Sequence, residues 1–289
     1  MRYLVVGASG FLGAHFVKHI NHRGHTAVGV GRADCDLYNE SSFARVLEEA
    51  SPHAVINCAG FTGRPNVEQC EANKADCLAA NAYLPAQLAK ACAARGVPFS
   101  HLSSGCLYSG RRSDGEGYRE SDPPNFSFRH NNCSWYSGTK ALGEELLADL
   151  PVRYVWRVRF PFSTVDSPRN YLSKILRYER LLDVENSLSS VPEMVDAALD
   201  CYERELPAGV YHLTNPGSVT TARVTELMLE EGVTTKGFDF FESEQEFRDT
   251  ASSIPRSNCV LDCSKALGHG LRLTPVEEAL RQTLRGWRS

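Results

Sequence analysis

The chain has 289 residues, of which 42% are hydrophobic and 23% are charged, and its formal net charge is −4 with a sequence pI near 6.2. This composition is typical of a globular protein, and the charge excludes the basic surface that binds a nucleic-acid backbone or an anionic membrane. No apolar run in the sequence approaches the roughly 18 residues of a membrane span. We therefore expect neither a nucleic acid nor a membrane as a partner.

The cysteines and the first residues indicate a cytoplasmic protein. Ten cysteines are scattered without a CxxC pair, so we interpret them as reduced thiols. The run Met1–Val6 passes directly into a glycine-rich loop and leaves no room for a signal peptide. The histidines lack metal-ligand spacing, and we expect no metal site.

Short apolar runs alternate with longer helical patterns through the first half of the chain. Strands are expected at residues 3–6, 26–30, 55–58 and 98–102, and helices at 11–23, 41–50 and 80–95. Such alternation builds a parallel sheet wrapped by helices, and continuous apolar runs indicate strands covered on both faces. The sequence thus predicts an α/β fold with a Rossmann-type doubly wound parallel sheet.

The pattern is interrupted at residues 109–132, a polar, glycine-rich stretch that we interpret as a functional flap. A helix beginning near Tyr136 and a strand at 153–159 resume it, and prolines punctuate short elements beyond Phe160. We expect residues 1–160 to form a dinucleotide-binding domain, with 191–214 returning to it. Residues 161–190 and 215–289 should then form a smaller C-terminal lobe that binds the substrate.

A glycine motif follows the first predicted strand and opens the first helix. Its sequence, Gly7-Ala8-Ser9-Gly10-Phe11-Leu12-Gly13, has the GxxGxxG spacing associated with short-chain dehydrogenases. Glycines let the backbone turn tightly and approach a pyrophosphate, whose charge the helix N-terminus stabilises. We predict that Gly7, Ser9, Gly10, Phe11, Leu12 and Gly13 bind a dinucleotide.

The end of the second predicted strand indicates which dinucleotide is bound. A carboxylate there would accept the 2′-OH of NAD, whereas an arginine would pair with the 2′-phosphate of NADP. The run Thr26–Gly31 leads directly to Arg32, with no acidic residue in its place. The sequence therefore favours NADP(H).

A YxxxK pair provides a proton donor. Tyr136 and Lys140 are four residues apart, which places both side chains on one helical face. A lysine ammonium beside a phenol lowers the pKa of the phenol from about 10. Ser104 follows an apolar strand, as does Ser103, and would orient a substrate carbonyl. We expect acid–base catalysis of carbonyl reduction here.

With these motifs in this order, the chain resembles the extended short-chain dehydrogenases close to dTDP-4-dehydrorhamnose reductase. It is still more similar to the bifunctional 3,5-epimerase/4-reductases that make nucleotide-linked rhamnose. Seven strings from both halves of the chain carry this resemblance. They are Thr62-Gly63-Arg64-Pro65-Asn66-Val67 with Cys70-Glu71, Gly105-Cys106, Pro124-Asn125-Phe126, Arg157-Val158-Arg159, Pro168-Arg169-Asn170 with Lys174, Thr214-Asn215-Pro216-Gly217, and Pro255-Arg256-Ser257-Asn258.

The resemblance implies roles for individual residues. Ser104, Tyr136 and Lys140 would be the reductase residues, and Cys106 and Lys174 the acid–base pair of the epimerase. Further cofactor contacts are expected from Asp36, Leu37, Cys58, Ala59, Gly60 and Phe160, besides Tyr136 and Lys140. The substrate would be a UDP- or dTDP-linked sugar diphosphate. We expect it to contact Thr62, Arg64, Asn66, Ser104, Cys106, Asn170, Lys174 and Arg256, with the arginines and Asn170 holding the diphosphate.

Several alternatives stay open at this point. One is a 4-reductase without epimerase activity, or an enzyme for another activated deoxy sugar or heptose. Another is a non-catalytic partner like the regulatory subunit of methionine adenosyltransferase, which shares this reductase-like fold. The segment Ser127–Trp135 is longer than the family pattern and could reshape the sugar pocket. The sequence also leaves the oligomeric state open, with a homodimer as one option.

Overall fold

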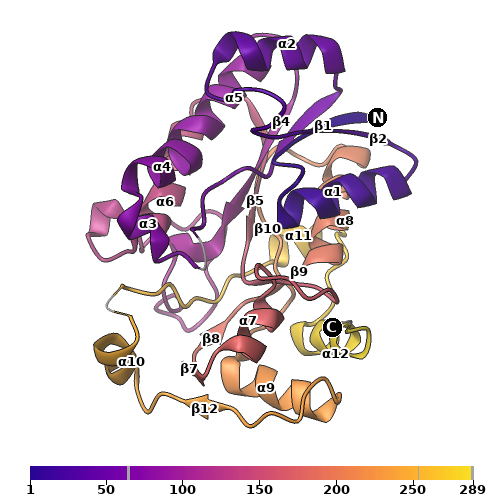
Figure 1. The fold of residues 1–289 in the computed structure, drawn as a ribbon. Helices are drawn as coiled ribbons and strands as arrows, with labels where there is room; N and C mark the ends of the chain where they lie inside the picture. The colour runs from indigo at the N-terminus through magenta and orange to yellow at the C-terminus, as the bar shows by residue number, and fades with distance from the viewer. Residues whose placement is uncertain (64–65, 253, 288–289) are drawn as a thin grey trace.

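The structure, a computed structural model, describes residues 1–63, 66–252 and 254–287. Its centre is a parallel sheet of six strands in the order β10-β5-β4-β3-β1-β2 (Figure 1). The strands are β1 (Arg2–Val6), β2 (Thr26–Val30), β3 (Ala54–Asn57), β4 (Phe99–Ser104), β5 (Val152–Val158) and β10 (Gly209–His212). This sheet confirms the predicted fold class.

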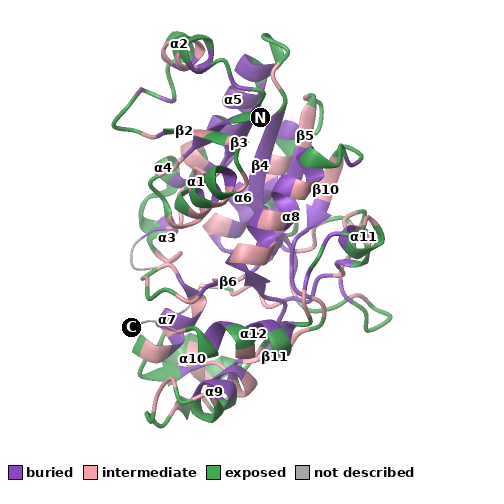
Figure 2. Cartoon of the chain, turned by 90° about the vertical axis from the view of Figure 1, so that its right-hand side faces the viewer, coloured by how far each residue is buried: buried purple, intermediate pink, exposed green. Residues whose placement is uncertain are grey.

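Helices cover both faces of the sheet, so its apolar strands are buried on both sides (Figure 2). One apolar cluster joins the sheet to α1 (Phe11–His22) and α8 (Val191–Glu203). A second cluster joins it to α2 (Glu40–Ala50) and α5 (Leu84–Ala93). Because parallel strands end at one edge, the loops that follow β1 to β5 meet above the carboxyl ends of the strands.

The later segments form a smaller group of short elements with its own apolar cluster. Its helices are α7 (Tyr171–Arg177), α9 (Thr221–Glu230), α10 (Glu244–Thr250) and α12 (Val276–Arg285), whereas α11 (Ser264–Gly268) packs against β10 and adds Ala266 to the first cluster. Its strands pair as β6 (Pro161–Phe162) with β9 (Ser189–Ser190), β7 (Arg180–Leu181) with β12 (Asp239–Phe240), and β8 (Glu185–Asn186) with β11 (Val219–Thr220). Among the described residues, no helix is long and apolar enough to cross a membrane.

The helix expected at 80–95 starts earlier and is not regular. It consists of α4 (Lys74–Leu78), a π-helical turn η1 (Ala79–Tyr83) and α5, preceded by α3 (Gln69–Ala72). Pro85 has no backbone N–H, so it cannot donate to the carbonyl four residues earlier, at Asn81. Gly143 packs closely there: an added Cβ would lie 2.2 Å from the Asn81 carbonyl oxygen. Gly143 belongs to α6 (Trp135–Leu147), so the irregular turn brings two helices together.

The stretch 109–132, interpreted from its composition as a functional flap, is held to the C-terminal segment at two points. Backbone bridges join Gly110 to Cys259 and Tyr118 to Leu261, and the Tyr118 hydroxyl donates to the carbonyls of Ser109 and Arg111. The stretch is therefore fastened to the C-terminal segment, because long-range backbone pairs satisfy groups that the sequence alone left unassigned.

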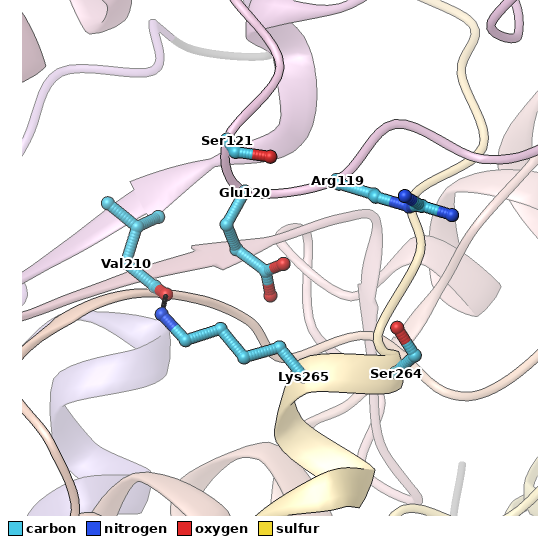
Figure 3. A pocket seen from close by; sticks show the side chains of 6 residues that line it. All are labelled: Arg119, Glu120, Ser121, Val210, Ser264 and Lys265. Carbon is cyan, nitrogen blue, oxygen red and sulfur yellow. Dashed lines mark hydrogen bonds between the residues drawn. The ribbon is translucent and has the colours of Figure 1, made fainter.

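A hollow lies beside the outer edge of β10 rather than at the carboxyl ends of the strands. Figure 3 shows Lys265 reaching the carbonyl of Val210, to which its Nζ donates at 2.6 Å, with Glu120 nearby. The Glu120 carboxylate accepts a hydrogen bond from the His212 backbone N–H at 2.8 Å. Side chains thus occupy the outward backbone groups of this edge strand, and none of the predicted site residues lines the hollow.

Candidate active site

The glycine loop between β1 and α1 has backbone approaches that a side chain would block. Gly7 has φ = +79°, and an added Cβ would lie 2.8 Å from the backbone nitrogen of Ala59. An added Cβ at Gly13 would lie 2.2 Å from the Gly7 carbonyl oxygen. Gly10 is the N-cap of α1 and provides no side-chain cap, so the first N–H groups of this 12-residue helix can bind an anion. The cradle fits a pyrophosphate.

The other residues of the loop and the two following turns differ in exposure. Ser9 is exposed, whereas Phe11 and Leu12 are half-buried at the start of α1. Asp36 is exposed and closes a turn by accepting a hydrogen bond from the Tyr38 N–H. Leu37 is buried in the apolar core, which leaves only its backbone to contact a cofactor.

The loop after β3 is held by two buried asparagines. Asn57 accepts from the Ala59 N–H at 2.9 Å, and Gly60 lies close to the Asn81 side chain. Asn81 exchanges two hydrogen bonds with the backbone of Phe61, at 2.8 and 2.9 Å. Sequence reasoning missed Asn81; its only signal was a polar residue in an otherwise apolar helical run. It fixes the path of the segment that contains Cys58.

The end of β2 differs from the prediction in one respect. Arg32 is exposed there as expected, but the chain also brings Asp34 back to this point. The Asp34 carboxylate accepts a hydrogen bond from the Gly31 N–H at 2.8 Å, and an added Cβ on Gly31 would lie 3.8 Å from the Ser9 hydroxyl. Asp34 was not among the neighbours of this site considered from the sequence. A tight turn after β2 brings the Asp34 carboxylate back to the end of the strand.

These two side chains give opposed predictions for cofactor preference. Arg32→Ala should lower the ratio of kcat/KM for NADPH over NADH about tenfold, because it removes a charge-assisted contact with the 2′-phosphate. Asp34→Asn should raise the same ratio, because it removes a negative charge. Steady-state kinetics with both cofactors measure the ratio, and Arg45→Ala, on the exposed face of α2, is the control. Equal kcat/KM values for the two cofactors in the unmodified protein would contradict the assignment.

Helix α6 presents Tyr136 and Lys140 toward the carboxyl end of β4, where Ser104 lies. Ser134 caps the helix by accepting from the Ser137 N–H, and Glu71 accepts from the Trp135 N–H at 2.6 Å. Burial raises the pKa of the Tyr136 phenol, and a hydrogen bond with Ser104 opposes that shift. The phenol is therefore protonated at neutral pH and suited to donate a proton.

The lysine does not lower the pKa of the phenol in the way expected from the spacing. Lys140 is buried, and its Nζ lies 3.3 Å from His101 Nε2 and 3.2 Å from the Leu102 carbonyl oxygen. Burial lowers the pKa of Lys140 and also that of His101, which Asn57 contacts at 3.1 Å. The shared helical face is correct, but partners on β4, which the motif could not reveal, hold the ammonium.

Cys106 lies two residues beyond Ser104, in the 3-10 turn η2 (Gly105–Leu107). The Ser104 hydroxyl accepts from the Cys106 N–H at 3.2 Å, which fixes the turn. Burial raises the pKa of the thiol, while the Ser104 hydroxyl, the Arg159 guanidinium and the Ser137 hydroxyl act against that shift. The structure thus groups the thiol with the residues predicted to act in reduction. It also brings in Arg159, a residue that the prediction left without a role.

A cluster of cations lies on the other side of the site. Lys174 on α7 is largely buried, and burial lowers its pKa, as do the charges of Arg169 and Arg256. Arg169 donates to the Thr62 hydroxyl at 2.5 Å, and Arg256 pairs with Glu68. Asn66 accepts from the Glu68 N–H at 2.9 Å. Like charges held together inside a protein favour an anionic ligand.

Arg64 and Asn170 were also predicted to hold the diphosphate of the substrate. Arg64 lies outside the described residues. Asn170 is fully buried as the N-cap of α7, where it accepts from the Leu172 N–H and donates to the carbonyls of Ser163 and Val165. The side-chain amide makes its hydrogen bonds within the protein and is not available to a ligand, so its assignment to the substrate was wrong. Arg169, the residue beside it, is the one that reaches the cation cluster.

The longer segment 127–135 packs on the outer face of α6 through its first residues, whereas Cys133 near its end lies close to Cys106. It contains the 3-10 turn η3 (Phe128–His130), and Phe128 covers Gly138, where an added Cβ would lie 2.2 Å from the ring. Arg129 pairs with Glu145 through two hydrogen bonds. Gly138 and Glu145 are on the face of α6 opposite Tyr136. The segment therefore mainly thickens the outer surface of α6.

Phe160 joins the two halves of the site at the end of β5. It has φ = +37°, a rare conformation for a bulky residue that is costly and typical of functional sites. Its ring stacks on Tyr171 with centroids 5.0 Å apart, and the Arg159 guanidinium lies 4.0 Å from its centroid. Tyr171 and Lys174 are three residues apart on α7, so they share a face.

Comparison with known proteins agrees with this geometry. The sequence matches the family described as RmlD substrate binding domain over residues 1–288. A bifunctional dTDP-4-dehydrorhamnose 3,5-epimerase/dTDP-4-dehydrorhamnose reductase of Arabidopsis thaliana is 33% identical over 287 residues, which cover 96% of this chain and 90% of the relative. This chain belongs to the RmlD family. The resemblance inferred from the motifs is confirmed.

Solved structures of RmlD-type proteins share the fold. The L780 UDP-rhamnose synthase of Acanthamoeba polyphaga mimivirus is 25% identical, with a TM-score of 0.88 over 99% of both chains. A dTDP-4-dehydrorhamnose reductase of Bacillus anthracis, determined in complex with NADP, is 20% identical, with a TM-score of 0.82 over 98% of both chains. The predicted class, an oxidoreductase of this family, is consistent with all three relatives.

Proposed function

We propose that this chain is an NADPH-dependent enzyme that epimerises a nucleotide-linked 4-keto-6-deoxyglucose at C3 and C5 and then reduces its C4 ketone, giving a nucleotide-linked rhamnose. The observation that carries the proposal is the grouping of Cys106 with Ser104 and Tyr136 at the end of β4. The shared thiol and phenol site supports both activities in one pocket. The relatives named for UDP-rhamnose and dTDP-rhamnose chemistry support the sugar class.

The reduction uses the Ser104–Tyr136 side of the site. NADPH supplies the hydride when it is bound along the glycine loop. The Ser104 hydroxyl orients the C4 carbonyl, and Tyr136 donates its proton to the oxygen as negative charge develops there. Burial keeps the phenol protonated, which suits a donor. Lys140, held by His101, replaces that proton through its own acidic N–H groups.

The epimerisation uses the acidity of protons next to the ketone. The C3 and C5 protons are both alpha to C4, so a base near neutrality removes them when the enolate oxygen is stabilised, which Tyr136 and Ser104 do. Cys106 as thiolate and Lys174 as ammonium would act from opposite faces of the ring. A lowered pKa makes Lys174 a better proton donor at neutral pH.

The decisive experiment incubates the protein with UDP- and dTDP-4-keto-6-deoxyglucose and NADPH and identifies the sugar by NMR. A rhamnose nucleotide is the expected product. The substrate with the higher turnover shows whether the enzyme prefers the uracil or the thymine nucleotide. A sugar that is reduced at C4 but keeps its original configuration at C3 and C5 would show that the protein is a 4-reductase without epimerase activity. Absence of turnover with tight binding to another protein would favour a non-catalytic partner.

The pairing of Arg256 with Glu68 predicts opposite effects on substrate affinity. Arg256→Met should raise KM for the nucleotide sugar about tenfold with a smaller change in kcat, because a charge-assisted contact with the diphosphate is lost. Glu68→Gln should lower KM, because the guanidinium no longer pairs with a carboxylate. Initial-rate kinetics test both variants. If both leave KM unchanged, Arg256 does not hold the diphosphate.

A further inference from the structure

Two arginines follow each other on one face at the end of β5, and their surroundings differ sharply. Both are buried, with only 5% of each exposed. Arg157 pairs with Glu144 through Nη2 at 2.7 Å and through Nε, so its charge is matched by a carboxylate. A buried charge is strongly destabilising unless it is paired, and Arg157 obeys that rule.

Arg159 has only neutral partners within residues 1–63, 66–252 and 254–287. Its Nε and Nη2 donate to Asn186 Oδ1 at 3.2 and 2.7 Å, and Nη2 also donates to the Ser257 carbonyl. The remaining contact is the face of Phe160. In this part of the chain neither Asp nor Glu pairs with it, and Nη1 has no hydrogen-bond partner. The protein therefore maintains a buried positive charge without a fixed anion.

Three groups near this charge are able to become anions: Tyr171, Cys259 and Cys106. Burial raises the pKa of Tyr171 to about 12, so it stays neutral. The Cys259 thiol donates to the Gly105 carbonyl at 3.2 Å, which uses its proton. Cys106 is the group left, beside Gly105, whose added Cβ would lie 3.5 Å from Arg159 Cδ.

We propose that Arg159 is the counter-ion of the Cys106 thiolate and thus a positioning residue that lets this thiol act as the base of epimerisation. The substrate then meets a base whose charge is stabilised before it arrives. Asn186 completes the arrangement, because its neutral amide holds the guanidinium without neutralising it. This inference rests on the proposed epimerase function for its purpose, but not for its test.

Other ionisable groups face the same thiol and do not replace Arg159. Tyr136 and Lys140 approach from α6, Cys70 from α3, and Cys133 from the segment before α6. Of these only Lys140 is a cation, and its ammonium contacts His101 and the Leu102 carbonyl instead. The thiols and the phenol are neutral or would repel a thiolate.

The test measures the rate of Cys106 alkylation by iodoacetamide against pH, with peptide mass spectrometry to resolve each cysteine. Arg159→Gln should move the Cys106 midpoint upward by about one pH unit and lower its rate at neutral pH about tenfold. Arg159→Lys should keep the midpoint near that of the unmodified protein. Cys133, half-buried next to Cys106, is the internal control and should move little.

A second variant keeps the arginine and changes only its charge balance. Asn186→Asp is nearly isosteric and places a carboxylate on the guanidinium, so it should raise the Cys106 midpoint as Arg159→Gln does. This variant decides the matter if Arg159→Gln does not fold. An unchanged midpoint in the folded variants overturns the proposal, and a raised KM for the nucleotide sugar without a shifted midpoint would assign Arg159 to the substrate instead.

Deuterium exchange at C3 and C5 separates this inference from the proposed function. If the unmodified enzyme exchanges no deuterium but the Cys106 midpoint depends on Arg159, the proposed epimerase function is wrong, whereas the role of Arg159 as counter-ion is supported. If exchange occurs at a normal rate in Arg159→Gln, with an unshifted midpoint, the epimerase stands and the counter-ion fails.

Discussion

Tyr136→Phe should lower the rate of C4 reduction by a factor of about 10³ while leaving NADPH binding nearly unchanged. The phenol is the group placed to give a proton to the C4 oxygen, and Phe keeps its ring but not its hydroxyl. We place the main grip on the dinucleotide at the glycine loop and Arg32, which this change does not touch. NADPH oxidation measured with a 4-keto-rhamnose nucleotide gives the rate, and fluorescence titration gives the cofactor affinity.

A matched control for this variant is Tyr83→Phe. Tyr83 is 57% exposed in η1, so losing its hydroxyl should change neither the rate nor cofactor binding. Near-normal turnover by Tyr136→Phe would mean that the tyrosine has only a structural role. Equal losses of turnover and of NADPH affinity would assign it to cofactor binding instead.

Cys106→Ala should lower the rate of deuterium exchange at C3 and C5 by about two orders of magnitude, because it removes the base that abstracts these protons. Reduction of an already epimerised 4-keto-rhamnose nucleotide should continue, since Ser104 and Tyr136 remain. Incubation of a 4-keto-6-deoxyglucose nucleotide in D₂O with NMR detection measures the exchange. In the unmodified enzyme, exchange should rise with pH. Burial raises the thiol pKa, so the thiolate fraction grows as pH increases.

The control for this variant is Cys133→Ala, which removes a half-buried thiol close to Cys106. That variant should retain exchange and reduction. Loss of both activities together in Cys106→Ala, with the fold intact, would show that the thiol supports the whole site. An unmodified enzyme that exchanges neither carbon would leave only the 4-reductase.

Local patterns were enough to predict five of the six strands of the sheet and the glycine loop, but not β10. The apolar runs gave strands close to those of β1 to β5, because continuous hydrophobicity between turns is a short-range signal. The GxxGxxG spacing indicated positions where two backbone segments approach so closely that only glycine fits. The structure shows such contacts at Gly7 and Gly13. The YxxxK spacing likewise fixed a common helical face for Tyr136 and Lys140.

What the sequence could not show depends on partners far along the chain. Asp34 returns to β2 through a turn, and Asn170 is consumed by carbonyls that only the folded loop brings near it. The ammonium of Lys140 is directed by His101, which is 39 residues away. Arg159 belongs to one of the strings that carry the resemblance, but the string gave it no role, because the sequence shows neither the lack of a carboxylate partner nor the thiol nearby.

The edge strand β10 also limits how two copies of the chain could associate. An unoccupied edge is a template on which a strand of another molecule adds, giving a continuous intermolecular sheet. Here Lys265 covers the Val210 carbonyl and Glu120 covers the His212 N–H, so one acceptor and one donor of this edge are already bonded. The two side chains therefore oppose the addition of a strand from a second copy at β10, and a dimer that extends the sheet there would have to displace both of them.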